Sequence, residues 1–101
     1  MKDVKYFKYG KEKLPFRLSY KAMKWYKQDV GIDGIDEDST DEQIEKYYYY
    51  GFKSGFDAIG KDSTVKLEDM EDILDEIMPE LMEVMSSFFL SKEKPQETVE
   101  K

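Results

Sequence analysis

Carboxylates are the side chains of this sequence whose types and spacing could do chemistry, and the first group begins at Asp29. Asp29, Asp33 and Gly34 match three positions of the EF-hand calcium loop. However, Gly31 and Thr40 occupy the positions of a further oxygen ligand and of the bidentate Glu. We therefore expect a solvated acidic loop that binds divalent cations weakly at most.

A second group of carboxylates lies in residues 67–76, where Asp72 and Glu76 are one helical turn apart. Two carboxylates can share acid and base roles only in a cleft that separates their pKa values. Here the pair shares a helix face with other acids, which is typical of a surface in open solvent. The chain also has no Cys and no His, which excludes thiol nucleophiles, Cys/His zinc sites and imidazole catalysis. We expect no enzyme activity, no metal site and no cofactor.

The composition predicts one small domain with a core of its own. Aromatic residues make up 15% of the 101 residues, which disfavours a disordered chain although 39% of the residues are charged. No apolar segment is long enough to span a membrane, and the first residues do not resemble a signal peptide. We therefore expect a soluble protein of the cytoplasm, and the absence of Cys suits that compartment.

The charges divide the chain into two parts of opposite sign. Residues 1–28 contain nine Lys and Arg against two acids, for a charge of +7. Residues 29–101 contain seven Lys against twenty-one acids, for a charge of −14, so the whole chain carries −7. Two such parts can attract each other within one chain or between subunits. This interpretation is favoured over a nucleic-acid surface, because the large negative part would repel phosphates.

The first residues have the pattern of a β-hairpin. Apolar and polar residues alternate from Asp3 to Leu18, with Gly10 at the start of a tight turn. Pro15 cannot donate a ladder hydrogen bond, so one side of its strand should be an edge. Because an isolated hairpin is marginal in water, we expect residues 3–18 to pack on helices or on another chain.

Three helices are expected after the hairpin, over about residues 20–30, 41–59 and 67–90. Ser19 and Thr40 are suited to cap the first two helices, and Gly31 to end the first. Pro79 should kink the third helix, because its ring clashes with the preceding turn and it donates no hydrogen bond. The polar tail of residues 91–101 is expected to be flexible.

Each helix has an apolar side. The first helix should bury Met23, Tyr26 and Val30. The second has a stripe made of Ile44, Tyr47, Tyr48, Gly51, Phe52, Gly55, Phe56 and Ile59. Because Gly costs roughly 1 kcal/mol more than Ala within a helix, we expect the hairpin or the third helix to pack closely on Gly51 and Gly55. These elements predict a mainly helical α+β fold in one compact domain over residues 1–90.

Two apolar regions are candidates for binding a partner. Four consecutive tyrosines span more than one helical turn, so Tyr49 and Tyr50 should stay partly exposed, and such tyrosines are enriched in protein interfaces. Beyond the expected kink, the third helix has a Met-rich and Phe-rich end that suits partners of varied shape. The candidate partner-binding residues are Tyr49, Tyr50, Met78, Met82, Met85, Phe88 and Phe89.

Three segments carry a likeness to a known family. They are LPFRLS at residues 14–19, YYYGFKSG at residues 48–55 and VKLEDMEDILDE at residues 65–76. In this order, over residues 4–90, the chain resembles the small tail assembly chaperones of long-tailed bacteriophages and prophages. The family often has a capping Thr where this chain has Lys66, so the third helix should start earlier or lack that cap.

The resemblance implies a chaperone that coats apolar helical segments of the tape-measure protein and keeps them soluble while the tail tube assembles. The tape-measure protein is then the expected partner, with the tail tube protein as a second candidate and self-association as a further expectation. Such a protein acts in the cytoplasm of the bacterial host and is absent from the finished virion. Two other functions stay open: an acidic inhibitor that mimics DNA, which the charge of −14 motivates, and a connector or tail-completion subunit of the particle.

Overall fold

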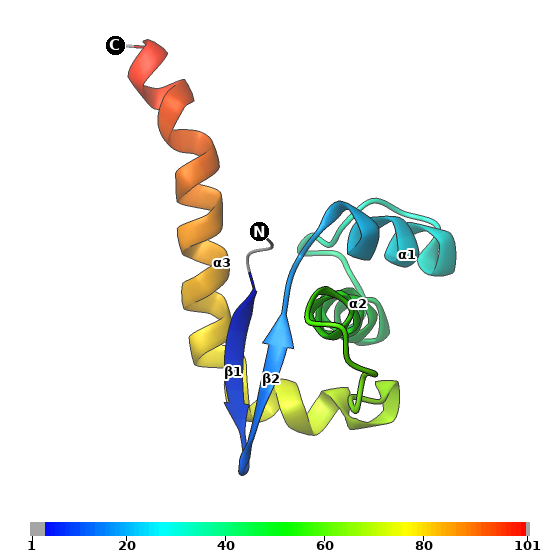
Figure 1. The fold of residues 1–101 in the computed structure, drawn as a ribbon. Helices are drawn as coiled ribbons and strands as arrows, with labels where there is room; N and C mark the ends of the chain where they lie inside the picture. Colours follow the sequence, from blue (N-terminus) through cyan, green and yellow to red (C-terminus); the bar gives the residue numbers. More distant parts are fainter. Residues whose placement is uncertain (1–3, 101) are drawn as a thin grey trace.

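The computed structural model describes residues 4–100, and within this range the side chains of residues 4–86. In chain order the elements are β1 (Lys5–Tyr9), β2 (Glu12–Phe16), α1 (Tyr20–Val30), α2 (Asp41–Ala58), the 3-10 turn η1 (Leu67–Asp69) and α3 (Met70–Glu100). Figure 1 shows the hairpin between α3 on one side and α1 and α2 on the other. The mainly helical α+β fold, with an N-terminal hairpin followed by three helices, is therefore confirmed.

The hairpin presents an apolar face to the helices. β1 and β2 pair antiparallel, with Phe7 opposite Leu14, and both of these side chains are buried. Gly10 opens the turn with a φ of +62°, a conformation that glycine adopts without strain. The sheet has only these two strands among the described residues, which agrees with the edge position expected for Pro15.

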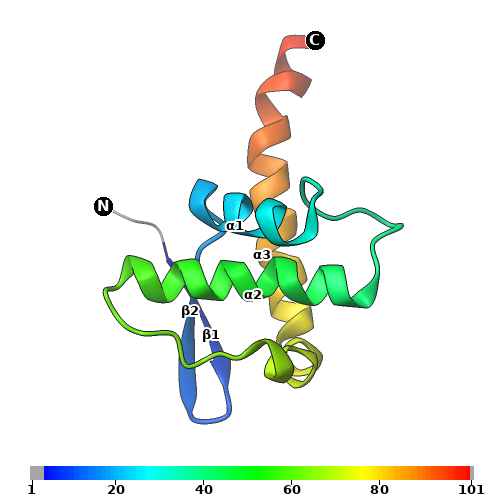
Figure 2. The same cartoon turned by 90° about the vertical axis from the view of Figure 1, so that its right-hand side faces the viewer.

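The first two helices begin and end where local chemistry predicts. The Ser19 hydroxyl accepts a hydrogen bond from the backbone of α1, and Gly31 ends this helix with a φ of +91°. Thr40 and Gln43 form a reciprocal capping box at the start of α2, with hydrogen bonds of 2.9 and 3.2 Å. α1 and α2 lie side by side (Figure 2). One side chain differs from the prediction: Ala22, and not Met23, is buried beside Tyr26.

α2 packs against the hairpin at its two glycines. A Cβ atom at Gly51 would lie 2.8 Å from Cζ of Phe16, and one at Gly55 would lie 2.6 Å from the Phe16 backbone nitrogen and closer still to the Pro15 carbonyl. The Arg17 N–H donates a 3.0 Å hydrogen bond to the Gly51 carbonyl. The expected close approach to bare helix backbone is confirmed, and the end of β2 makes it.

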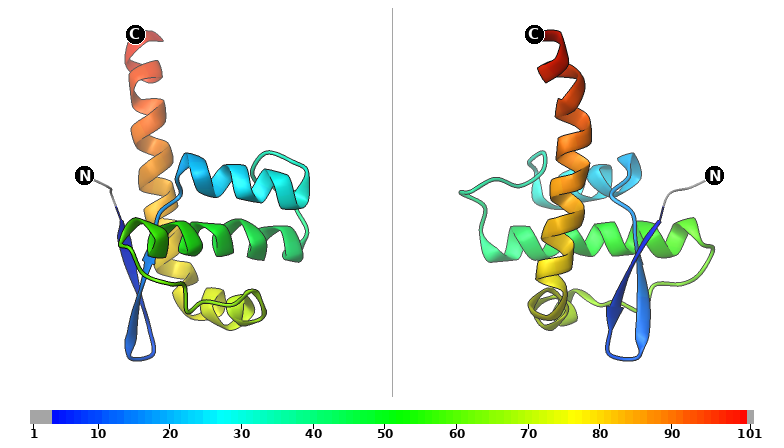
Figure 3. Two further views of the ribbon diagram at one scale, coloured as in Figure 1. Left: turned by 45° about the vertical axis from the view of Figure 1, so that its right-hand side comes forward. Right: turned by 90° about the vertical axis from the view of Figure 1, so that its left-hand side faces the viewer.

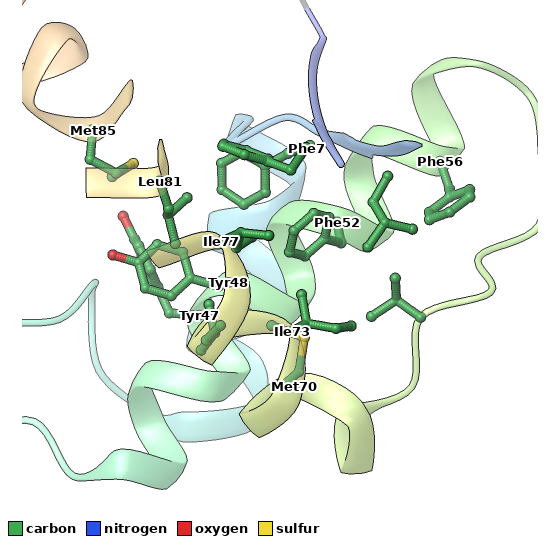
Figure 4. Close-up of a cluster of buried hydrophobic side chains, with 14 of the residues drawn as sticks. Phe7, Tyr47, Tyr48, Phe52, Phe56, Met70, Ile73, Ile77, Leu81 and Met85 are labelled. Carbon is green, nitrogen blue, oxygen red and sulfur yellow. The ribbon is translucent and has the colours of Figure 1, made fainter. Parts of the chain in front are cut away.

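The core lies where the hairpin, α2 and α3 meet (Figure 4). Aromatic rings fill its centre, with edge-to-face contacts between Phe7 and Phe16 at 5.6 Å and between Phe16 and Phe52 at 5.1 Å. The α3 side supplies the aliphatic and thioether residues Met70, Ile73, Leu74, Ile77, Leu81 and Met85. The apolar stripe predicted for the second helix therefore shares one core with the apolar side of α3.

The third helix begins and ends at residues that differ from the prediction. Lys66 precedes η1 without a side-chain cap, as expected, and α3 starts only at Met70 after this 3-10 turn. α3 then continues to Glu100 and passes the predicted end at residue 90. Lys, Glu and Gln recur in this last segment, and because they are strong helix formers a polar composition does not end the helix. The flexibility predicted for residues 91–101 concerns a segment outside the described side chains and stays a prediction.

α3 changes direction once along its length. Figure 1 shows the bend in the yellow part of the helix, near residue 80 of the colour bar, where a kink at Pro79 is expected. Before the bend, the Glu76 carboxylate accepts a 3.3 Å hydrogen bond from the Gly10 N–H at the hairpin turn. After it, α3 extends past the other elements (Figures 1 and 3), and the molecule measures 46 × 29 × 24 Å.

Candidate functional site

A shallow depression on α3 is one candidate site. Its volume is about 430 Å³, and it is lined by Glu71, Asp72, Leu74, Asp75 and Met78. These residues recur every three or four positions, so the helix itself brings them to one side. Met82 follows Met78 one turn later and is 54% exposed. We call these six residues the α3 surface.

The α3 surface combines an apolar centre with acidic borders. Leu74 is buried and belongs to the core, whereas Met78 is half-buried and Met82 is exposed, so these two methionines provide a short apolar strip along the helix. Glu71, Asp72 and Asp75 are not joined in a salt bridge to any described Lys or Arg. Their charges are therefore available to a partner that carries positive groups.

Acids of η1 and α3 help to raise the pKa of one neighbouring group. This group is the hydroxyl of Tyr9, at the end of β1, which interacts electrostatically with these acids. Burial, followed by the charges of Asp72, Glu76 and Asp69, raises the pKa of the Tyr9 hydroxyl above its usual value. The negative potential of this side of α3 thus extends to the hairpin.

The other apolar residues predicted at this end of the third helix have different positions. Met85 is only 6% exposed and belongs to the core (Figure 4), so it offers a partner almost no surface. Phe88 and Phe89 lie outside the described side chains. The open part of the predicted Met-rich patch therefore consists of Met78 and Met82 among the described residues.

The second predicted region is mostly an internal contact between helices. Tyr47 and Tyr48 are buried while Tyr49 and Tyr50 are partly exposed, as predicted. Tyr50 donates a 2.8 Å hydrogen bond to the Asp29 carboxylate at the end of α1. Its ring centroid lies 6.3 Å from that of Trp25. Tyr50 thus joins α2 to α1, and its role in binding a partner stays a prediction.

Lysines complete this contact, which we call the α1–α2 seam. The seam consists of Trp25, Asp29, Lys46, Tyr50 and Lys53. The Lys53 ammonium lies 5.0 Å from the Trp25 ring centroid and 5.8 Å from that of Tyr50. Lys46 forms a 3.3 Å salt bridge with Asp29. No sequence pattern singles out Trp25, because a single Trp on a short helix gives no periodicity that would identify its neighbours.

Hydrogen bonds in the seam shift two pKa values in opposite directions. The hydrogen bond from Tyr50, helped by Lys46, lowers the pKa of the Asp29 carboxyl. Burial and the hydrogen bond to Asp29 raise the pKa of Tyr50 to about 12. The seam therefore keeps Asp29 charged and Tyr50 neutral across the whole physiological pH range. The carboxylate of Asp29 and the hydroxyl of Tyr50 thus hold α1 and α2 together.

The acidic loop between α1 and α2 satisfies much of its own polarity. The Asp36 carboxylate accepts a 2.9 Å hydrogen bond from the Asp38 N–H, and the Ser39 hydroxyl accepts one from the Asp36 N–H. Asp33 forms a 3.4 Å salt bridge with Lys27. Within the described part of the chain, no three acidic side chains are grouped so that they could hold a metal ion.

Two further findings concern membrane-spanning helices and the likeness to known proteins. Among the described residues, no helix has the length and apolar character needed to cross a membrane. Comparison with models of protein families, with curated proteins and with solved structures finds no match for this chain. The likeness to tail assembly chaperones therefore rests on the three sequence segments alone.

Proposed function

We propose that this protein is a tail assembly chaperone of a long-tailed bacteriophage or prophage, which binds apolar helical segments of the tape-measure protein in the cytoplasm of the host. The observation that carries the proposal is the α3 surface. Met78 and Met82 stay open beside the core, one helical turn apart, which is a spacing that a second helix can follow. The sequence segments shared with the family point in the same direction.

The chemistry of the α3 surface suits this task in two ways. Unbranched Met side chains adapt to partners of different shape, as a chaperone of a long and varied protein requires. The acids on the borders stay hydrated and charged, so they keep a complex of apolar segments in solution. Because the strip is short, one contact is weak, and stable protection needs many copies along the tape-measure protein.

The direct test measures binding to overlapping fragments of the tape-measure protein encoded in the same genome. We expect apolar helical fragments to bind, and Met82→Asp to weaken binding roughly ten- to a hundredfold, because the aspartate cannot be buried in the contact. Met23→Asp is the matched control, since Met23 is also exposed, at 40%, but lies on α1. This variant should bind the fragments at least as well as the wild type.

Two results would overturn the proposal. One is the absence of binding to any fragment, and the other is equal weakening by both aspartate variants. Salt dependence separates the acidic DNA-mimic function, because binding of that kind weakens steeply as salt rises. An apolar contact should change little between about 0.1 and 0.5 M salt. The presence of the protein in purified virions would instead favour a structural subunit.

A further inference from the structure

The α3 surface differs between its two ends. Glu71, Asp75, Met78 and Met82 follow one another on one side of the helix, at steps of four, three and four residues. The first two of them are acidic and the last two are apolar, so the acids precede the methionines along α3. Asp75 and Met82 lie about 10 Å apart along the helix, because each residue adds about 1.5 Å. The α3 surface therefore has a negative end and an apolar end.

The carboxylates at the negative end have no basic partner within the described part of the chain. Glu71, Asp72 and Asp75 are exposed, and none of them forms a salt bridge with a described Lys or Arg. By contrast, the Glu76 carboxylate accepts a hydrogen bond from the Gly10 N–H. Glu71 and Asp75 are also four residues apart, and like charges at this spacing destabilise a helix. A cation bound beside them would offset this repulsion.

The apolar end offers a contact of a different kind. Met78 is half-buried and Met82 is 54% exposed. A partner that covers these thioether groups must itself be apolar there, since a buried polar group would lose its water without gaining a hydrogen bond. A helical partner that continues along α3 reaches the acids with the next turns of its own length. Complementarity therefore requires a partner that is apolar at one end and cationic at the other.

We infer that the α3 surface selects helical segments in which two apolar residues are followed or preceded by two Lys or Arg residues. The four residues of such a segment recur at the same steps of four, three and four, so that each faces its counterpart on α3. This inference rests on the proposed function and adds which segments of the tape-measure protein are bound. Segments of equal apolarity that carry acids at these positions are excluded, because like charges would face each other.

The charges select the segment, whereas the apolar contact supplies most of the affinity. Exposed ion pairs contribute little energy each, so two pairs should favour a basic segment over a neutral one by about threefold to tenfold. Acids at the same positions should weaken binding by a similar factor. The preference should shrink in about 0.5 M salt, where the Debye length is only about 4 Å. Binding of a neutral segment should hardly depend on salt.

Three synthetic peptides test the preference without any tape-measure sequence. Each is an alanine-rich helix of about 20 residues, long enough to be partly helical in water, and each carries the same two Leu residues one turn apart. The two positions that match the acids hold Lys, Gln or Glu. Titrations followed by NMR in about 0.1 M salt should give affinities in the order Lys, Gln, Glu, with signal shifts at residues 71–82. Equal affinities of the three peptides overturn the inference.

A charge-reversal variant and a matched control locate the preference. Glu71→Lys with Asp75→Lys should reverse the order, so that the Glu peptide binds most tightly. Glu37→Lys with Asp38→Lys changes the net charge equally, from −7 to −3, but lies in the loop between α1 and α2 and should keep the wild-type order. All four side chains are exposed, so both variants should fold, which circular dichroism checks. If both variants change the order equally, the overall charge and not the α3 surface selects the peptide, and the inference fails.

Tape-measure fragments separate this inference from the proposed function. Replacing the basic residues of a bound fragment by Gln should weaken its binding about threefold to tenfold. If fragments bind through Met82 but tolerate this replacement, the proposed function stands and the inference is overturned. If no fragment binds, but the Lys peptide binds the wild type and not Met82→Asp, the charge preference stands and the proposed function fails. Peptide affinity that falls as protein concentration rises would make a second copy of the chain the occupant and overturn the inference.

Discussion

α2 and α3 carry apolar stripes of the same kind, yet one stripe is closed and the other is partly open. α2 presents Gly51 and Gly55 to the end of β2, where the backbones approach so closely that no side chain fits between them. α3 covers the core with its first turns but leaves Met78 and Met82 accessible at the edge. An amphipathic pattern therefore predicts which face of a helix is apolar, while the neighbouring element decides how much of that face is covered.

The largest effect is expected where the closed stripe is tightest. Gly55→Ala should destabilise the protein by about 2–3 kcal/mol, because the new methyl group must displace the Pro15 and Phe16 backbone. This net cost already includes the gain of roughly 1 kcal/mol in helix propensity. Gly51→Ala should cost less, since the ring of Phe16 can shift more easily than a strand. Urea unfolding measures both changes.

Gly34→Ala provides the control for this comparison. Nothing lies within 4 Å of a Cβ atom at Gly34, and only its φ of +73° opposes a side chain. This substitution should cost about 1 kcal/mol, the usual penalty of a left-handed backbone. A Gly55→Ala variant that is as stable as Gly34→Ala would show that the α2–β2 contact is looser than described.

The closed side of α2 should also respond to alkaline pH. Burial raises the pKa of Tyr47 to about 12, against about 10 in the unfolded chain. Because the folded state holds the neutral hydroxyl more strongly, this stabilisation is complete below pH 10 and is lost as pH rises from about 10 to 12. The loss should reach about 2–3 kcal/mol. Between pH 10 and 12 the midpoint of thermal unfolding should fall less steeply with pH in Tyr47→Phe than in the wild type. An equally steep fall in both proteins would contradict the raised pKa of Tyr47.

The hydroxyls of Tyr50 and Tyr26 differ in hydrogen bonding, so their Phe variants should differ in the free energy of unfolding. Tyr50→Phe removes the hydrogen bond to Asp29 and should cost about 1 kcal/mol, because the pair is partly exposed. The substitution should also bring the pKa of Asp29 closer to its ordinary value. The stability that Asp29 contributes is present above pH 4 and lost as pH falls through its lowered pKa, and this contribution should decrease in the variant.

Tyr26→Phe is the matched control within α1. The Tyr26 hydroxyl is buried and has no hydrogen-bond partner among the described residues. Its removal should therefore leave the free energy of unfolding unchanged or increase it by up to about 1 kcal/mol. Equal losses in the two variants would mean that the hydroxyl of Tyr26 makes a stabilising contact.

The smallest effect on stability is expected on the open stripe. Met82→Asp should change the free energy of unfolding by no more than about 0.5 kcal/mol, because Met82 is 54% exposed and touches little of the core. Met85→Asp, one turn along, should be strongly destabilising, since it would bury a carboxylate. Equal free energies of unfolding for Met82→Asp and Met85→Asp would show that α3 is exposed to solvent at both positions.

Much of the fold could be predicted from the sequence because its signals are local. Ser19 and Thr40 cap their helices through hydrogen bonds to residues three positions away, whereas Gly10 and Gly31 adopt the positive φ that the hairpin turn and the end of the first helix require. The end of α3 at Glu100 differs from the prediction for a local reason as well: a polar composition predicts an end near residue 90, whereas Lys, Glu and Gln favour a helix.

The candidate site was only partly predictable. Local sequence patterns predict the order of the elements, the caps of the first two helices, the apolar side of the second helix and the opposite charges of the two parts of the chain. Only the tertiary structure decided that Met82 is open while Met85 is buried, that Met23 points outward, and that Tyr50 binds Asp29. The physical reason is that helical periodicity depends on neighbours three and four residues away, whereas burial depends on which distant element packs against each turn.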